Sequence, residues 1–375
     1  AAGAGAYAAV TAVTVGMALS IGTAVATATM MLTTKKPSLS DYRSASERSQ
    51  VLRAAASDKT CVYGRVISSG LLSNAKEQVG DQTDGELIYL ALTIAGHKIN
   101  GLGRIWLGDD LIETFGELAS YELHNDRQTC DPYMLANCPN WREDMIGQGI
   151  AWVRLTLKFD AEKFPSGLPN IKMEKFGAEV WDPRDNKVKL TDNAALVILD
   201  YYRRWLKVPD DELRMNEFII AANICDELIT LKDGTREKRY AINGEFDLSE
   251  APAKILEDMH MSCAGQPTYV SGMHGIVVGA YYGPASEDLF DHQLQGDIDL
   301  LPEPPASDRI NTVVGTFIDG ETFQKMDFPA VKVAEWVEED DGQELTEDLD
   351  FRFVTSPWQA QRLANILLRQ RQIGR

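Results

Sequence analysis

The residues best suited to chemistry in this sequence are a histidine and a cysteine three positions apart. His260 and Cys263 fall on one face of a predicted helix, and an imidazole nitrogen with a thiolate sulfur is a donor pair that Zn²⁺ accepts. A metal site needs further ligands at a set spacing, and the sequence offers none beside this pair. We therefore predict that both side chains are structural and that the chain holds no metal.

A second group places a histidine among carboxylates. Asp291-His292 lies just before Asp297 and Asp299, and a serine joining them could act as a nucleophile with its base. The Gly-x-Ser-x-Gly pattern that exposes a nucleophilic serine on a sharp turn occurs nowhere in the chain. We interpret this group as a polar loop and predict no catalytic residue.

Two further patterns resemble ligand sites but have the wrong spacing. Gly101-Leu102-Gly103 lacks the third glycine and the following helix of a dinucleotide-binding turn, so we predict a hairpin turn and no cofactor. The acidic run from Glu335 to Asp350 lacks the alternating oxygen ligands and central glycine of a calcium loop. We predict instead a solvated hairpin between Trp336 and Phe351, which could also face a lumen.

The cysteines indicate a protein made in the cytoplasm. Their number is odd and no CxxC pair occurs, so neither a disulfide framework nor a zinc or iron–sulfur site is indicated. Cys130 and Cys138 flank a short loop-like segment and could pair, although only their proximity supports this. The five cysteines are Cys61, Cys130, Cys138, Cys225 and Cys263.

Composition and charge exclude several classes of protein. The chain has 375 residues, 44% of them hydrophobic and 25% charged, which predicts two or three globular domains. Its net charge of −19 repels phosphate, so we predict no specific nucleic-acid binding. The acidic surface could simply keep the protein soluble, or it could line a conduit through which DNA passes without sticking.

Residues 1–32 carry no charge and consist mainly of Ala, Gly, Thr and Val. Such a segment could pack as a bundle inside an oligomer, insert into a membrane, or be disordered. It lacks the basic front of a secretory signal. Residues 33–56 are expected to form a helical connector. Because the chain opens on Ala1, we expect a fragment of a longer polypeptide.

The elements that must position these residues divide into three expected domains. Residues 57–192 are predicted to be a first β-barrel with an insertion near 121–148. Its strands are expected at Cys61–Ile67, Glu86–Ala95, Ile99–Leu107, Ile150–Leu157 and Phe176–Trp181. Within it Leu87 to Ile94 is apolar on both faces, which indicates a strand covered on both sides.

Residues 193–300 are predicted to be a small α+β domain. A first helix is expected over Ala194–Leu206, with Asn193 as its cap. A second is expected after Asn216, with a buried stripe that reaches Leu228-Ile229. A third is expected from Ser249, with Pro252 in its first turn. Two-stranded elements are expected at Arg239–Glu245 and Thr268–Ala280. The predicted fold class is therefore mainly β with α+β.

After a stiff linker at Leu301-Pro302-Glu303-Pro304-Pro305, residues 301–375 are predicted to form a second β-barrel domain with a closing helix. Strands are expected at Asn311–Ile318, Ala330–Val337 and Phe351–Val354. Ser356-Pro357-Trp358-Gln359 is a capping box with proline at the first helical position, so the closing helix begins there.

The sequence contains an ordered set of stretches: Val62 to Val66, Val180 to Arg184, Ala195 to Tyr201, Phe218 to Glu227, Arg239 to Gly244, Ile255 to Met259 with Cys263 to Gly265, Asn311 to Thr316 with Asp327 to Pro329, and Phe353 to Pro357 with Ala360 to Ala364. This ordered set resembles the central tail hub, or tip attachment protein J, of lambda-like siphophages, the host specificity protein of such phages. The resemblance covers about residues 61–372 and departs from the family at 121–148 and at the Ala/Gly-rich start.

The resemblance implies a structural protein of the virion, at the distal end of a bacteriophage tail. It implies a homotrimeric hub with β-barrel domains flanking the α+β domain, closing the tail tube around a channel for DNA ejection. The implied partners are the distal tail protein and other tail tip proteins, the tape measure protein, and a central fibre that continues from the C-terminus and carries host attachment. The family has no active site or cofactor to transfer to this chain.

Two other functions stay open at this point. A tail-associated cell-wall hydrolase would need a catalytic Glu in a cleft or a His/Cys/Asp zinc set. A membrane-inserting conduit, with contact to the host membrane, would depend on residues 1–32. We expect the structural, non-enzymatic hub.

Overall fold

A computed structural model describes residues 57–80, 83–164, 167–283, 290, 293 and 309–371. The segment 1–32, the connector 33–56, the Asp291-His292 group and the proline-rich linker at 301–305 lie outside the described residues. Within the described part of the chain, no helix is both long and apolar enough to cross a lipid bilayer.

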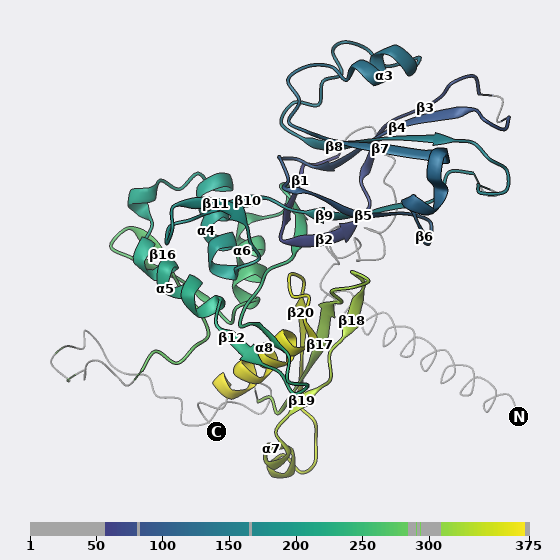
Figure 1. The fold of residues 1–375 in the computed structure, drawn as a ribbon. Helices are drawn as coiled ribbons and strands as arrows, with labels where there is room; N and C mark the ends of the chain where they lie inside the picture. The colour runs from purple at the N-terminus through teal and green to yellow at the C-terminus, as the bar shows by residue number, and fades with distance from the viewer. Residues whose placement is uncertain are drawn as a thin grey trace, which may run out of the picture. The chain divides into compact units, whose positions relative to one another are not determined.

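Two four-stranded antiparallel sheets form the first part of the chain (Figure 1). Leu90, Leu92 and Ile94 of the central strand β4 are buried in the core that both sheets share. No pairing joins the two sheets among the strands described, so the expected first barrel is an open sandwich. One sheet has the order β3 (Leu71–Glu77), β4 (Leu87–Ala95), β8 (Ala151–Lys158), β7 (Ala119–Asn125), and the other β2 (Arg65–Ser68), β9 (Ile171–Phe176), β5 (Gly101–Leu107), β6 (Asp110–Leu111).

The opposite face of β4 is covered as well. Tyr89 and Ala91 alternate with the core residues and pack beside Met134 and Trp152 in a second apolar cluster. Met134 lies in α3 (Pro132–Asn137), within the loop that joins β7 to β8. The expected strand with two covered faces is thus confirmed, but the loop begins only after Asn125 because β7 completes the sheet.

Two expected strands of this part are divided. Gly64, at φ +64°, separates β1 (Thr60–Tyr63) from β2, and β1 pairs with β14 (Gly244–Asp247) instead of with the sandwich. The expected Phe176–Trp181 strand is interrupted at Gly177, where a Cβ would lie 2.4 Å from the Val62 carbonyl oxygen. The chain resumes as the hairpin β10 (Glu179–Asp182) and β11 (Lys187–Leu190), and the 3₁₀ segment Ile112–Leu118 joins β6 to β7.

Helices and short hairpins make up the middle part. Asn193 caps α4 (Ala194–Asp200) as expected, because its Oδ1 accepts a hydrogen bond from the Leu196 N–H at 3.2 Å. The helix continues as a π-helical turn over Tyr201–Trp205, and the 3₁₀ turn Asp210–Glu212 follows. The other elements are α5 (Met215–Cys225), α6 (Pro252–Met261), and the hairpins β12–β13 (Leu228–Thr230 and Arg236–Lys238) and β15–β16 (Gln266–Val270 and Met273–Val277).

Two predictions for this part are wrong. The second helix ends at Cys225, so Leu228 and Ile229 lie on β12 and do not extend its buried stripe. The structure has no single strand over Arg239–Glu245. Strand β13 ends before this range, and β14 begins only at Gly244. In both cases pairing with another strand, and not the local pattern, decides where the strand lies.

The last part is one small sheet covered by a helix. In the described residues β17 (Thr312–Ile318) pairs with β18 (Lys325–Asp327), with β19 (Val331–Lys332) and, in parallel, with β20 (Thr346–Phe351). The helix α8 (Pro357–Gln370) packs on β17 and β19 and begins at the predicted cap, because Ser356 Oγ accepts from the Gln359 N–H. The whole described chain is therefore mainly β with α+β, as predicted.

The predicted strand at Ala330–Val337 is confirmed only over Val331–Lys332, and the one predicted at Phe351–Val354 is wrong beyond Phe351. The chain leaves β19 at Lys332 and turns into α7 (Ala334–Glu339), so Trp336 faces the core from a helix. The strand β20 precedes Val354 and runs parallel to β17. Because α7 takes the place of the first arm and β20 pairs with β17, the expected hairpin between Trp336 and Phe351 is also wrong.

Candidate functional site

The His260 and Cys263 pair is enclosed in the core. His260 Nδ1 donates to the Leu256 carbonyl oxygen at 2.6 Å, one turn back along α6. Burial lowers the pKa of His260 and raises the pKa of Cys263 well above its usual value, so both stay neutral near pH 7. A protonated thiol is a poor metal ligand. The described residues contain no group of three or more His, Cys, Asp or Glu side chains arranged around a metal site.

Gly101 and Gly103 lie inside β5, so the predicted hairpin turn is wrong. The register of β5 against β9 shifts between Leu102 and Ile105, which marks a bulge. A Cβ on Gly103 would lie 2.3 Å from Glu174 Oε2. The glycine thus permits a carboxylate from the neighbouring strand to approach the backbone, and it is not a phosphate-binding turn.

The acidic run from Glu335 to Asp350 spreads over α7, a loop and β20. Several of its carboxylates are paired with cations: Asp350 with Lys325 at 2.8 Å and Glu344 with Lys332 at 3.0 Å. Asp340 accepts from Asn311 Nδ2 at 2.9 Å, next to the start of β17. These contacts stabilise the small sheet, and their carboxylates do not converge on one point.

Cys130 and Cys138 are both free. Cys138 is buried beneath the β7–β8 loop, and Cys130 Sγ lies 3.3 Å from the Arg142 carbonyl oxygen. The pairing considered from the sequence is therefore not formed.

Polar side-chain contacts join the three parts of the described chain, and sequence reasoning missed them. Asn243 Oδ1 accepts from the Arg65 N–H at 2.9 Å, while its Nδ2 donates to Thr355 Oγ1 at 3.1 Å. The Asn243 N–H donates to the Phe353 carbonyl oxygen at 2.9 Å. One asparagine thus ties β2 of the sandwich to the segment between β20 and α8.

A second junction surrounds Glu174 on β9. Its carboxylate binds Arg65 Nε at 2.5 Å and accepts from the Arg104 N–H at 3.0 Å. Burial acts to raise the pKa of Glu174, but the hydrogen bonds from Arg104 and Arg65 outweigh it and lower the pKa to about 2. Arg65 also donates to the Gly320 carbonyl oxygen at 2.7 Å, so this ion pair connects the sandwich to the last sheet.

A third junction connects β1 to the end of α4. Tyr63 Oη donates to Asp200 Oδ2 at 2.6 Å and accepts from Trp205 Nε1 at 3.0 Å. Arg204 Nε lies 3.0 Å from the same carboxylate oxygen. Burial raises the pKa of Asp200 although Arg204 opposes this, and burial raises the pKa of Tyr63 well above its usual value. Side chains held in this way position one another and are not free for acid–base work.

Buried ion pairs complete the junctions. Lys175 Nζ on β9 lies 3.1 Å from Glu245 Oε2 on β14, and Ser68 Oγ donates to the same oxygen at 2.8 Å. Arg352 holds Glu250 with a hydrogen bond of 2.7 Å from Nη2. A charged side chain can be shielded from water only where groups of opposite charge or hydrogen-bond donors pair with it. These paired contacts therefore hold the parts of the chain together.

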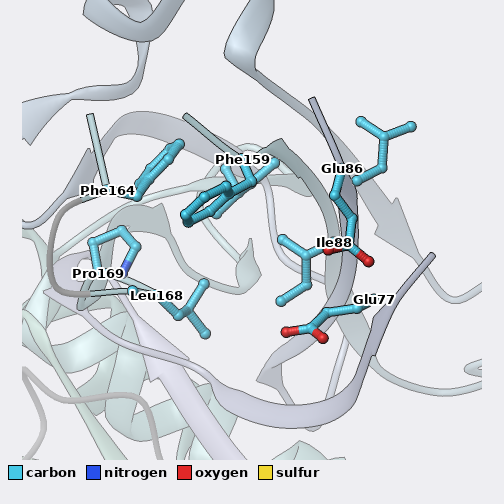
Figure 2. Close-up of a pocket in the computed structure, with 10 residues that line it drawn as sticks. Glu77, Glu86, Ile88, Phe159, Phe164, Leu168 and Pro169 are labelled. Carbon is cyan, nitrogen blue, oxygen red and sulfur yellow. The ribbon is translucent and has the colours of Figure 1, made fainter. Parts of the chain in front are cut away.

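Figure 2 shows the pocket at the open end of the sandwich. Phe159, Phe164 and Leu168 form one side, and Glu77 and Glu86 lie on the other. Its volume is about 120 Å³, whereas small-molecule sites usually exceed ~300 Å³. Glu86 Oε1 accepts from the backbone N–H groups of Val79 and Gly80, so it holds a turn. The pocket is too small for a polysaccharide, and one of its two carboxylates has a structural partner.

A wider groove of about 350 Å³ lies beside α4 and β10. Its two arginines are already engaged: Arg203 pairs with Asp210 at 2.7 Å and stacks over Trp181 at 4.3 Å, and Arg204 binds Asp200. Guanidinium groups with bound carboxylates offer little to an anionic ligand. The geometry of the described residues thus supports a structural framework better than a reaction site.

The comparisons with known proteins show a likeness of fold. No protein-family model matches the sequence, and no curated protein matches it. A chain in the solved structure of the virion of a native gene transfer agent (GTA) particle is similar in structure, with a TM-score of 0.57 and 12% sequence identity. The alignment covers 86% of this chain and 75% of that chain. At this level of identity the likeness establishes that the two chains share a fold.

Proposed function

We propose that this protein is a structural component of a phage-like virion: the trimeric central hub at the distal end of a tail. The single observation that supports the proposal most strongly is the shared fold with a virion chain over 86% of this sequence. In this role the domains 57–192, 193–300 and 301–375 would form one rigid wall of the tail tip.

The junctions described above support a role in which the domains keep a fixed arrangement. Asn243, Glu174 and Lys175 connect all three parts by buried or half-buried polar contacts, and such networks resist relative movement of domains. A hub that closes a tail tube must keep its shape while partners attach, whereas a hydrolase needs an open cleft with free catalytic groups.

The proposed partners are two further copies of this chain, the distal tail and tail tip proteins, the tape measure protein and a central fibre. Host attachment and passage of DNA through the channel would follow from that position. With a net charge of −19 the hub would let DNA pass without binding it specifically.

The test is to delete the gene in the strain that produces the particle and to image the particles by electron microscopy. We expect particles whose tails are missing or lack the tip, and restoration by the wild-type chain. Antibody-gold labelling should then mark the distal end of the tail. Intact tails in the deletion strain, or gold on the head, would contradict the proposal.

The hydrolase alternative has its own test. Purified protein is applied to peptidoglycan in a zymogram beside the variants Glu77→Gln and Glu86→Gln, which remove the two carboxylates of the pocket in Figure 2. We expect no clearing by any of them. Clearing by the wild type that either variant abolishes would assign the enzymatic function instead.

A further inference from the structure

The β15–β16 hairpin differs in charge from the rest of the described chain. From Met259 through Gly283 the sequence contains no Asp, Glu, Lys or Arg, although these residues make up 25% of the protein. The same stretch exposes large side chains: Tyr281 is 86% and Tyr269 67% exposed. We call this the uncharged surface, and its exposed large side chains are Tyr269, Val270, Val277, Tyr281 and Tyr282.

The uncharged surface is held on a fixed frame. The hairpin closes with a two-residue turn in which Ser271 and Gly272 have φ of +53° and +81°, the pattern that matches the twist of paired strands. Strand β16 packs against α5, and Thr268 Oγ1 donates to Glu217 Oε2 of that helix at 2.9 Å. The exposed side chains are therefore presented by an ordered scaffold.

Backbone contacts extend this order beyond the hairpin. Tyr240 Oη donates to the Gly279 carbonyl oxygen, and Tyr282 Oη bonds the backbone N–H and C=O of Val278 at 3.0 Å each. Pro267 removes one backbone donor from β15, which disfavours the addition of a further strand there. An approaching protein would thus contact side chains and not extend the sheet.

The net charge of the chain indicates which partner binds to the uncharged surface. Each copy of this chain carries a net charge of −19, so any contact between copies must overcome mutual repulsion. The repulsion is smallest where neither surface contributes an unpaired carboxylate and where apolar area becomes buried. Glu217, the carboxylate beside the hairpin, is paired with Arg214 at 2.6 Å. A basic partner would instead favour the acidic surfaces, such as the run from Glu335 to Asp350. We propose that copies of this chain meet through the uncharged surface.

This inference rests on the proposed trimeric hub and specifies its contact. We place the uncharged surface at the threefold axis of that trimer, because only at the axis do the same residues from each copy lie near one another. Tyr269 and Tyr281 would supply the anchors, because large aromatic side chains dominate the energetics of interfaces.

The first test introduces like charges at this contact. The full chain is prepared as the wild type, as Tyr269→Glu/Tyr281→Glu, and as the control Val79→Glu at a residue that is 76% exposed in the β3–β4 connection. Mass is measured by size exclusion with light scattering. We expect trimers for the wild type and the control but monomers for the double variant, with the same far-UV circular dichroism spectrum for all three.

The second test reports proximity directly. Tyr281→Cys in a Cys130→Ser background should form disulfide-linked pairs of chains under mild oxidation, whereas Val79→Cys in the same background should not. Cys130 is replaced because it is the most exposed of the native cysteines. Trimers that tolerate the charged variant and give no cross-link would overturn the inference while leaving the hub intact.

Two further outcomes separate the alternatives. A wild-type chain that stays monomeric at every concentration would contradict both this inference and the trimeric hub. Flotation with phosphatidylcholine vesicles distinguishes a lipid surface: binding that Tyr269→Glu/Tyr281→Glu abolishes, without a change in oligomeric mass, would assign the surface to a membrane and overturn the inference.

Discussion

The side chain of Asn243 accepts a hydrogen bond from the backbone N–H of Arg65 at 2.9 Å, across a sequence separation of 178 residues. Gly64 makes this contact possible. At φ +64° it turns the chain from β1 into β2, and its missing side chain leaves room for the Asn243 amide. The turn and the amide form one unit on which the sandwich and the middle part of the chain both depend.

Replacing Gly64 by alanine should therefore destabilise the protein more than its conformation alone explains. The new Cβ would lie 2.3 Å from Asn243 Oδ1 and 2.7 Å from the Ile242 carbonyl oxygen. Gly108 is the matched control, because its φ is +68° and no atom lies within 4 Å of a Cβ there. In urea unfolding we expect Gly64→Ala to lose about 1–3 kcal/mol more than Gly108→Ala. Equal losses would show that the Asn243 contact is dispensable.

The Glu174 ion pair should make the free energy of unfolding depend on pH at low pH. Because the pKa of Glu174 is lowered from 4.5 to about 2 in the folded protein, its contribution is present above pH 4.5 and is lost as the pH falls through 2. We expect Glu174→Gln to reduce the free energy of unfolding by about 1–3 kcal/mol at pH 7. The difference between the two proteins should shrink between pH 4.5 and 2 in urea titrations, and a constant difference would contradict the assignment.

His97 should stay neutral well below the usual range of histidine. Its Nδ1 donates to the Lys98 carbonyl oxygen, and Nε2 accepts from the Val62 N–H at 2.9 Å, which only the unprotonated nitrogen can do. Burial lowers the pKa of His97 to about 4. The unfolded chain therefore binds a proton first, and stability falls as the pH drops from about 6.5 to 4. Histidine NMR spectra should show a neutral ring at pH 5, and a midpoint near 6.5 would refute this.

Local signals in the sequence were sufficient for the starts of α4 and α8. Asn193 and Ser356 each accept a hydrogen bond from a backbone N–H three positions ahead, so the capping contact depends on neighbouring residues. The two-residue turn at Ser271-Gly272 is equally local. The mainly β with α+β fold class follows from such signals, because each depends only on neighbouring residues.

The remaining elements depend on residues far away in the sequence. Gly103 was interpreted as a turn because the carboxylate that needs its space, Glu174, lies on another strand. The acidic run was expected to fold on itself, whereas Thr346–Phe351 pairs in parallel with β17. The junction residues were missed for the same reason: an asparagine or a lysine has no local pattern that reveals its partner.

The ion pair between Lys175 and Glu245 allows a test of whether the junction contributes to the free energy of unfolding or only positions β9 and β14. Removing one charge with Lys175→Met leaves Glu245 buried without its cation, although Ser68 still donates to it, and should cost about 3–5 kcal/mol. The double variant Lys175→Met/Glu245→Leu removes both charges and should recover most of that loss, since apolar side chains of similar size fill the site. Urea unfolding of the wild type, the two single variants Lys175→Met and Glu245→Leu, and the double variant gives the coupling free energy. Lys332→Met is the control, because Lys332 makes an exposed ion pair with Glu344 and its loss should be within about 0.5 kcal/mol. If the double variant were as unstable as Lys175→Met, Glu245 would not be the group that holds Lys175 in place.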